Sequence, residues 1–142
     1  MMRFARLIRE KSGAAVIEFA LVAPVFIALM MGVVEVGLYM QNYNAVHSLA
    51  TDATRFATVE YQKNNKIDTT TMENNIGSLG VESPYNLNPN YLHVAVTPVT
   101  PSAVNGALQF NLTIDYDLPD LIGGTSIDNI TISYSRQIFV LA

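Results

Sequence analysis

The first third of the chain contains a long apolar run. Between Ala14 and Met40 the only formal charges are Glu18 and Glu35, and the run has 27 residues. About 20 apolar residues are enough to cross the hydrocarbon core of a membrane as a helix. The run is too long for the hydrophobic part of an ordinary secretory signal. Residues 14–40 are therefore predicted to form a transmembrane helix.

From Asn44 onwards the apolar positions become one-sided. They recur at spacings of three and four residues, as on one face of a helix. These positions are Val46, Leu49, Ala50, Ala53, Phe56 and Ala57. The transmembrane helix is therefore expected to continue as an amphipathic helix over residues 41–61, with an apolar face that can cover a sheet.

Period-two alternation dominates the second half of the chain. Apolar and polar residues alternate in three segments, which predicts strands with one buried and one solvated face. The strands are expected over residues 91–97, 107–118 and 129–140. Connections of about ten residues favour an antiparallel meander, so residues 62–142 should form a β-rich head domain. The predicted fold class is α+β, with the amphipathic half of the long helix packed against a small antiparallel β-sheet.

A second, short helix is predicted ahead of the first strand. It covers Thr69–Leu79, where the threonines at its start are candidate N-caps. Gly77 and Gly80 are candidate stop signals. A turn rich in proline and asparagine follows and leads into the sheet.

Charge is distributed unevenly along the chain. The first 12 residues carry a net charge of +3, whereas the remaining 130 carry −7. The bases of this leader, which spans residues 1–13, are Arg3, Arg6, Arg9 and Lys11. A basic flank keeps its end of an apolar run in the cytoplasm, so the acidic body should lie across the membrane. The body has no basic patch to neutralise phosphates, which argues against a nucleic-acid partner.

The sequence contains no recognisable catalytic or cofactor motif. It has no cysteine, which excludes disulfides, thiolate metal sites and cysteine nucleophiles. It also lacks a nucleophile elbow and a phosphate-binding loop. We therefore expect a protein that is not an enzyme and needs no cofactor. His47 and His93 lack nearby ligands and fit surface positions better than a metal site.

One acidic stretch suggests a metal. Asp115, Asp117 and Asp120 follow a D-x-D-x-x-D spacing. A calcium loop also needs backbone carbonyls and a bidentate carboxylate, and this stretch lies at the end of a predicted strand. A solvated strand end is the better interpretation, and calcium binding is the alternative.

Glu18 and Glu35 are the two carboxylates of the apolar run. A carboxylate within a spanning helix costs about 2.5–3.5 kcal/mol on insertion scales. Glu18 is either hydrated at the cytoplasmic interface or paired with a partner in an apolar setting. Glu35 is expected near the headgroups on the far side, with a subunit contact as the alternative.

The sequence around Glu18 resembles two related patterns. A short basic leader ends in Gly13, and Glu18 is the fifth residue after it, as in type IV prepilins. The string GAAVIEFALVAPVF over residues 13–26, which includes Phe19 and Pro24, is similar to the TadE-like family of tight-adherence (Flp-type) pilus proteins. The chain lacks the metal-binding pattern of TadG-type relatives and is longer than the major Flp pilins. The resemblance is therefore to a minor pilin or pseudopilin, with a pilin-like fold.

The resemblance also implies processing and assembly. A prepilin peptidase would cut between Gly13 and Ala14, and the freed amine of Ala14 would neutralise Glu18 of a neighbouring subunit. Phe19 and Pro24 would belong to the same assembly segment. The implied partners are the peptidase, other pilins or pseudopilins, the inner-membrane pilus assembly platform and membrane lipid. The chain would cross the bacterial inner membrane once, with its head in the periplasm or in the pilus.

Two alternatives stay open from the sequence. The chain could be a signal-anchored periplasmic binding module that is neither cleaved nor polymerised. It could also be a pseudopilin of a type II secretion-like machine. Cleavage after Gly13 would separate the first alternative from a pilin-like subunit.

Overall fold

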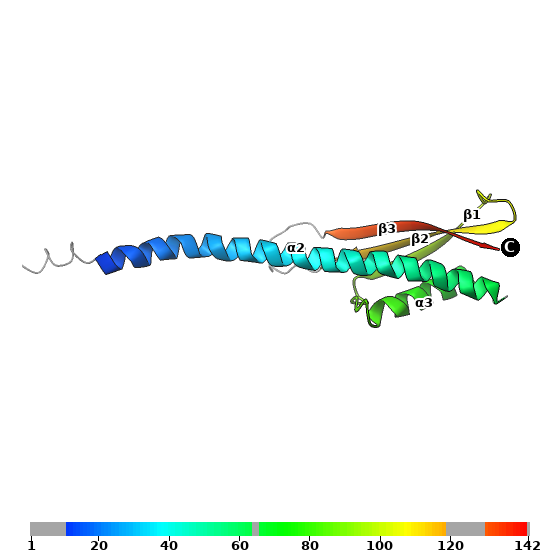
Figure 1. The fold of residues 1–142 in the computed structure, drawn as a ribbon, viewed down its shortest axis with the longest axis horizontal. Helices are drawn as coiled ribbons and strands as arrows, with labels where there is room; N and C mark the ends of the chain where they lie inside the picture. The colour runs from blue at the N-terminus through cyan, green and yellow to red at the C-terminus, as the bar shows by residue number, and fades with distance from the viewer. Residues whose placement is uncertain (1–10, 64–65, 119–129, 142) are drawn as a thin grey trace, which may run out of the picture. The chain divides into compact units, whose positions relative to one another are not determined.

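A computed structural model describes residues 11–63, 66–118 and 130–141. In chain order, the elements are α2 (Lys11–Gln62), α3 (Thr69–Val81), β1 (Leu92–Val99), β2 (Ala107–Asp117) and β3 (Thr131–Leu141) (Figure 1). The chain divides into two compact units, Met1–Leu38 and Tyr39–Ala142. The predicted α+β class is confirmed, because a long apolar helix, a second helix and one antiparallel sheet account for all the elements described.

Helix α2 has 52 residues and contains Pro24. It is already helical at Lys11, so the helix includes the last residues of the predicted leader. Its last turn ends near Lys63, whose N–H donates to the carbonyl of Val59 at 3.1 Å. No proline or glycine pair interrupts the sequence between Gly37 and this end, which is why the helix continues into the second unit.

Helix α3 is close to its predicted range, but its cap differs from the prediction. Asp68 is the N-cap, and its side chain accepts hydrogen bonds from the backbone and hydroxyl of Thr71. These bonds, chiefly that from the hydroxyl, lower the pKa of Asp68. Gly77 lies inside the helix, which ends after Gly80. A carboxylate at the N-cap satisfies N–H groups that the first turn leaves free.

The sheet has the order β1-β2-β3, with antiparallel pairing on both sides of β2. Leu92 lies opposite Tyr116 in one pair, and Phe110 lies opposite Ile138 in the other. The turn between β1 and β2 contains Gly106 at a φ of 81°, a left-handed conformation that favours glycine. The predicted antiparallel meander is therefore confirmed.

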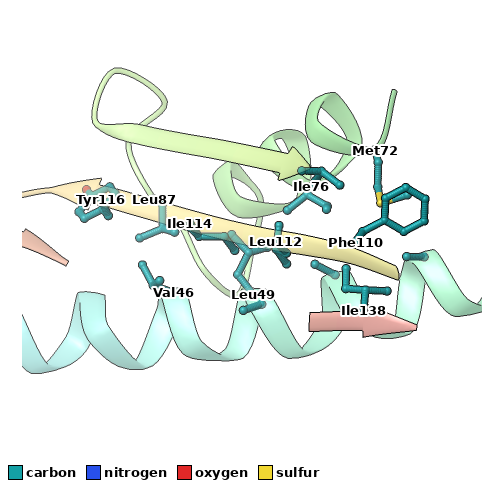
Figure 2. Packing of buried hydrophobic residues seen from close by; sticks show 14 of the residues in the cluster. Val46, Leu49, Met72, Ile76, Leu87, Phe110, Leu112, Ile114, Tyr116 and Ile138 are labelled. Carbon is teal, nitrogen blue, oxygen red and sulfur yellow. The ribbon is translucent and has the colours of Figure 1, made fainter. Parts of the chain in front are cut away.

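Both helices of the second unit cover the same face of this sheet (Figure 1). Figure 2 shows Val46 and Leu49 of α2 near Leu112 and Ile114 of β2, with Ile76 of α3 in the same core. The core also includes Ala50, Ala53, Ala57, Met72, Leu87, Val96, Phe110, Tyr116, Ile132, Ile138 and Val140. The predicted apolar stripe of α2 is thus buried, except for Phe56, which is only half-buried.

Gly80 shows how closely the helices and the sheet approach. A Cβ atom at this position would lie 2.7 Å from Leu92 Cδ2 and 2.8 Å from Leu49 Cδ2. Both distances are shorter than normal carbon contacts of about 3.5–4.0 Å. The glycine that sequence analysis took for a stop signal therefore also lets α3 pack between α2 and β1.

Tyr85 connects the segment after α3 to α2. Its hydroxyl donates a hydrogen bond to the Asp52 carboxylate. Burial, and after it the hydrogen bond and the negative charge of Asp52, together raise the pKa of Tyr85 to about 12. The folded state favours the neutral phenol, so this contribution to stability is present below a pH of about 10 and is lost as the pH rises through 12.

This tyrosine provides a test by titration. Ultraviolet absorbance of tyrosinate should show a group in the folded chain that ionises near pH 12 and disappears in Tyr85→Phe. In Asp52→Asn the pKa should fall, because the charge is removed, but it should stay above 10 because burial remains. An unchanged titration in Asp52→Asn would contradict the contact.

Candidate assembly and processing site

The apolar surface that α2 presents in the first unit is not covered by any other described residue of that unit. The helix is long and apolar enough to cross a membrane, and its most apolar window is 0% buried. The large side chains of this surface are among the most exposed in the structure, with Phe19 at 73% and Leu21 at 71%. A core helix of a soluble protein would be mostly buried, so this surface fits lipid or other subunits instead.

Glu18 lies on this uncovered surface. Its side chain is exposed, and it has no hydrogen bond or ion pair with any residue in the described ranges. Its sequence neighbours Ile17 and Phe19 are apolar and at least 63% exposed. Ala14 precedes Glu18 by four residues and so lies about one helical turn away on the same side. The carboxylate therefore depends on water, lipid headgroups or another molecule for a partner.

Gly13 is not required by the fold of the chain. A Cβ atom placed there would meet nothing within 4 Å. Gly80 differs in this respect, because its Cβ would collide with two leucine side chains. The local structure would thus accept a side chain at Gly13, so any demand for glycine there comes from outside the described residues.

The remaining predicted residues of this segment do not form one cluster. Pro24 is exposed and Glu35 is half-buried. Glu18 and Glu35 are 17 positions apart, or about 25 Å along a helix. Lys11 lies in α2, whereas the leader residues Arg3, Arg6 and Arg9 lie outside the described residues.

The predicted acidic motif is split between a strand and an undescribed segment. Asp115 and Asp117 lie on β2, and Asp120 is outside the described residues. Asp117 accepts a hydrogen bond from the hydroxyl of Thr131 at 2.6 Å, and one of its oxygens lies 3.5 Å from His93 Nε2. Within residues 11–63, 66–118 and 130–141, no group of three metal-ligating side chains is present.

His47 lies on α2, far along the chain from His93, and packs against an aromatic ring. Its imidazole makes an edge-to-face contact with Tyr134 of β3, with ring centroids 4.9 Å apart. One turn further along α2, Thr51 Oγ1 accepts a hydrogen bond from Arg136 at 3.0 Å. These two contacts hold α2 against β3.

Arg136 is a residue of this contact whose role was not predicted from the sequence. The signal was present, since the alternation that places Ile132 and Tyr134 on the helix-facing side also places Arg136 there. A charged residue is unusual on the core-facing side of a small sheet. Its long side chain can extend to the rim of the core and bind a polar group there.

A comparison with protein families identifies the same segment. The model of the TadE-like protein family matches residues 13–55. The match begins at Gly13 and includes Glu18 and the Phe19–Pro24 string. No curated protein and no solved structure matches the chain. Residues 13–55 are therefore similar to the TadE-like family, as the motif predicted.

Proposed function

We propose that this chain is a minor pilin or pseudopilin used to assemble a tight-adherence (Flp-type) pilus. The TadE-like family is associated with such pili, which supports a role in the pilus system. The observation that carries the proposal is the start of the family match at Gly13, between a basic leader and an apolar helix. The uncovered surface with the unpartnered Glu18 supports a role in contacts between subunits.

The proposed topology follows from the charge pattern. The leader bases Arg3, Arg6, Arg9 and Lys11 keep the N-terminus in the cytoplasm. The apolar part of α2 crosses the inner membrane, and the sheet domain lies in the periplasm or in the pilus. Membrane lipid and other pilins are then the molecules that cover the exposed side chains around Phe19 and Pro24.

The proposed role is structural and not enzymatic. Prepilin peptidase is the partner that acts on the chain, and other pilins, pseudopilins and the assembly platform are the partners that it binds. Within the subunit interface, the Ala14 amine pairs with Glu18 of a neighbour, because an ion pair removes the cost of a lone charge in an apolar contact. Glu35 is proposed as a second contact further along the helix.

Processing at Gly13 is the experiment that tests this function. Mass spectrometry of the protein from its native host should find an N-terminus at Ala14. Gly13→Leu should accumulate as uncleaved precursor, because the side chain obstructs the scissile bond while the fold has room for it.

Gly37 provides the matched control. A Cβ there also meets nothing within 4 Å, so Gly37→Leu adds the same bulk to α2 away from the cleavage site and should be processed normally. Native protein that still begins at Met1 or Met2 would rule out the pilin-like function and favour an uncleaved anchor.

A further inference from the structure

The two edges of the sheet differ in how they are protected. At the β1 edge, the N–H of Val96 donates to Glu73 Oε1 of α3 at 2.7 Å. Pro98, near the end of the same strand, has no N–H to offer. A charged side chain, a proline and a neighbouring helix are the usual means by which proteins close a sheet edge. The β1 edge is therefore closed to a further strand.

At the β3 edge, part of the backbone has no hydrogen-bond partner among the described residues. In an antiparallel pair, alternate residues direct both backbone groups towards the partner strand. The Leu118 N–H donates to the carbonyl of Ile130 at 3.0 Å, so with the observed register the even-numbered residues of β3 bond to β2. The odd-numbered residues direct their N–H and C=O groups away from β2. They are Thr131, Ser133, Ser135, Gln137, Phe139 and Leu141, and all six are exposed.

No backbone group of these six residues bonds to another residue in the described part of the chain. The strand is also long for an edge, with 11 residues, and it contains no proline, lysine or acidic residue. Its single charge, Arg136, is turned towards α2. Among residues 11–63, 66–118 and 130–141, none of the protections found at the β1 edge is therefore present along β3.

The helix side of this edge is basic. His47 and Thr51 of α2 contact β3, and Arg55 follows one turn later on the same stripe of the helix. Among the described residues, neither Arg55 nor Arg136 has a carboxylate within 4.0 Å. These two residues are half of the four bases in residues 13–142, a region with eleven acids. A strand added here would place alternate side chains beside these unpaired guanidinium groups.

We propose that β3 accepts an extended segment of a partner protein as a fourth strand, with an aspartate or glutamate on its helix-facing side. Main-chain bonds to the six free residues hold the segment, and the carboxylate pairs with Arg136 or Arg55. A second copy of this chain is a poorer occupant. Its β1 edge is closed, and its β3 would bring another Arg136 and no carboxylate. The inference concerns the sheet domain and does not depend on cleavage or on Glu18.

Hydrogen exchange resolved to single residues tests the proposal. The full chain is compared in mild detergent, once produced alone and once extracted from membranes of its native host. Even-numbered amides of β3 should exchange slowly in both samples, because they bond to β2. The six odd-numbered amides should exchange quickly in the chain alone and at least tenfold more slowly in the native sample. Odd-numbered amides that are fast in both samples, or slow in both, overturn the proposal.

Gln137 offers a substitution confined to the free edge. Its N–H points away from β2 and its side chain has no partner in the described residues. Gln137→Pro removes this donor and blocks a neighbouring strand while leaving the β2 ladder intact. In native extracts it should return the other odd-numbered amides to fast exchange, whereas Gln137→Ala should not. Slow even-numbered amides in both variants show that the sheet is still folded. Slow odd-numbered amides in Gln137→Pro contradict a docked strand.

Two further variants test the chemistry of the partner. Arg55→Glu should weaken protection of the odd-numbered amides in native extracts, and Lys66→Glu, a reversal of charge in the segment between α2 and α3, should not. Equal protection in the two variants overturns an acidic partner.

The chain has no cysteine of its own, so any disulfide formed by Gln137→Cys identifies the molecule that lies next to β3. A disulfide dimer of this chain as the main product overturns the choice of a different protein.

Discussion

Replacing Leu112 with aspartate is expected to unfold the sheet domain. Leu112 lies on the central strand, is 0% exposed and belongs to the core between the sheet and the helices. A charge placed there has no partner, and an uncompensated buried charge costs about 3–5 kcal/mol. A domain of this size is stable by only about 5–15 kcal/mol. For a domain near the lower end of that range, the substitution removes most or all of the stability, which is why we expect unfolding.

The control is the neighbouring residue on the same strand. Asn111 is on the other face of the sheet, where its side chain accepts a hydrogen bond from Ser135, so Asn111→Asp adds the same charge outside the core. Circular dichroism of the full chain in detergent should show loss of the strand signal and of the thermal transition in Leu112→Asp only. A melting temperature in Leu112→Asp close to that of the wild-type protein would falsify the packing described for β2.

The sequence predicted the faces of the sheet because the pattern has the period of a strand. Phe110, Leu112 and Ile114 occupy alternate positions, and the side on which they lie is the side covered by the helices. The same reasoning succeeded for α2, where apolar residues at helical spacing became the buried stripe. Periodicity fixes which side chains share a face, and burial of that face then follows from the hydrophobic effect.

Near the turn between β1 and β2, the burial predicted from the alternation was wrong. Leu108 was expected to be buried but is 38% exposed, and Gln109 was expected to face solvent but is only 5% exposed. The Gln109 side chain accepts a hydrogen bond from the N–H of Ala103 at 2.7 Å, so the turn folds over it. The path of a turn depends on tertiary contacts, which a strand pattern does not contain.

The sequence also did not predict that the β1 edge is closed. Glu73 is an ordinary polar residue of a short helix until the fold brings its carboxylate to the N–H of Val96. Pro98 was the one readable signal, since proline in a strand favours an edge position. The candidate assembly site rests on local features, a glycine, a glutamate and an apolar run, so the sequence alone was enough to propose it. Its proposed ion pair joins two subunits and so stays a prediction.

Substitution of Glu18 distinguishes an assembling subunit from a simple membrane anchor. In the described chain its carboxylate has no partner and projects from an otherwise apolar surface. If it is only hydrated at the interface, Glu18→Ala removes a small insertion cost and leaves function intact. If it pairs with the amine of Ala14 in a neighbour, the same change leaves that amine unpaired in an apolar contact, where it costs several kcal/mol.

We therefore expect Glu18→Ala to be inserted and cleaved normally but to lose incorporation. Insertion depends on the leader bases and cleavage on Gly13, so neither should change. Electron microscopy of cells should show few pili, and crosslinks to partner pilins should disappear. Glu18→Asp should be partly defective because its carboxylate is one methylene shorter. Glu18→Gln should behave like Ala, since it keeps hydrogen bonding but not charge. Normal pili and normal crosslinks in Glu18→Ala would show that Glu18 is only a hydrated charge at the interface.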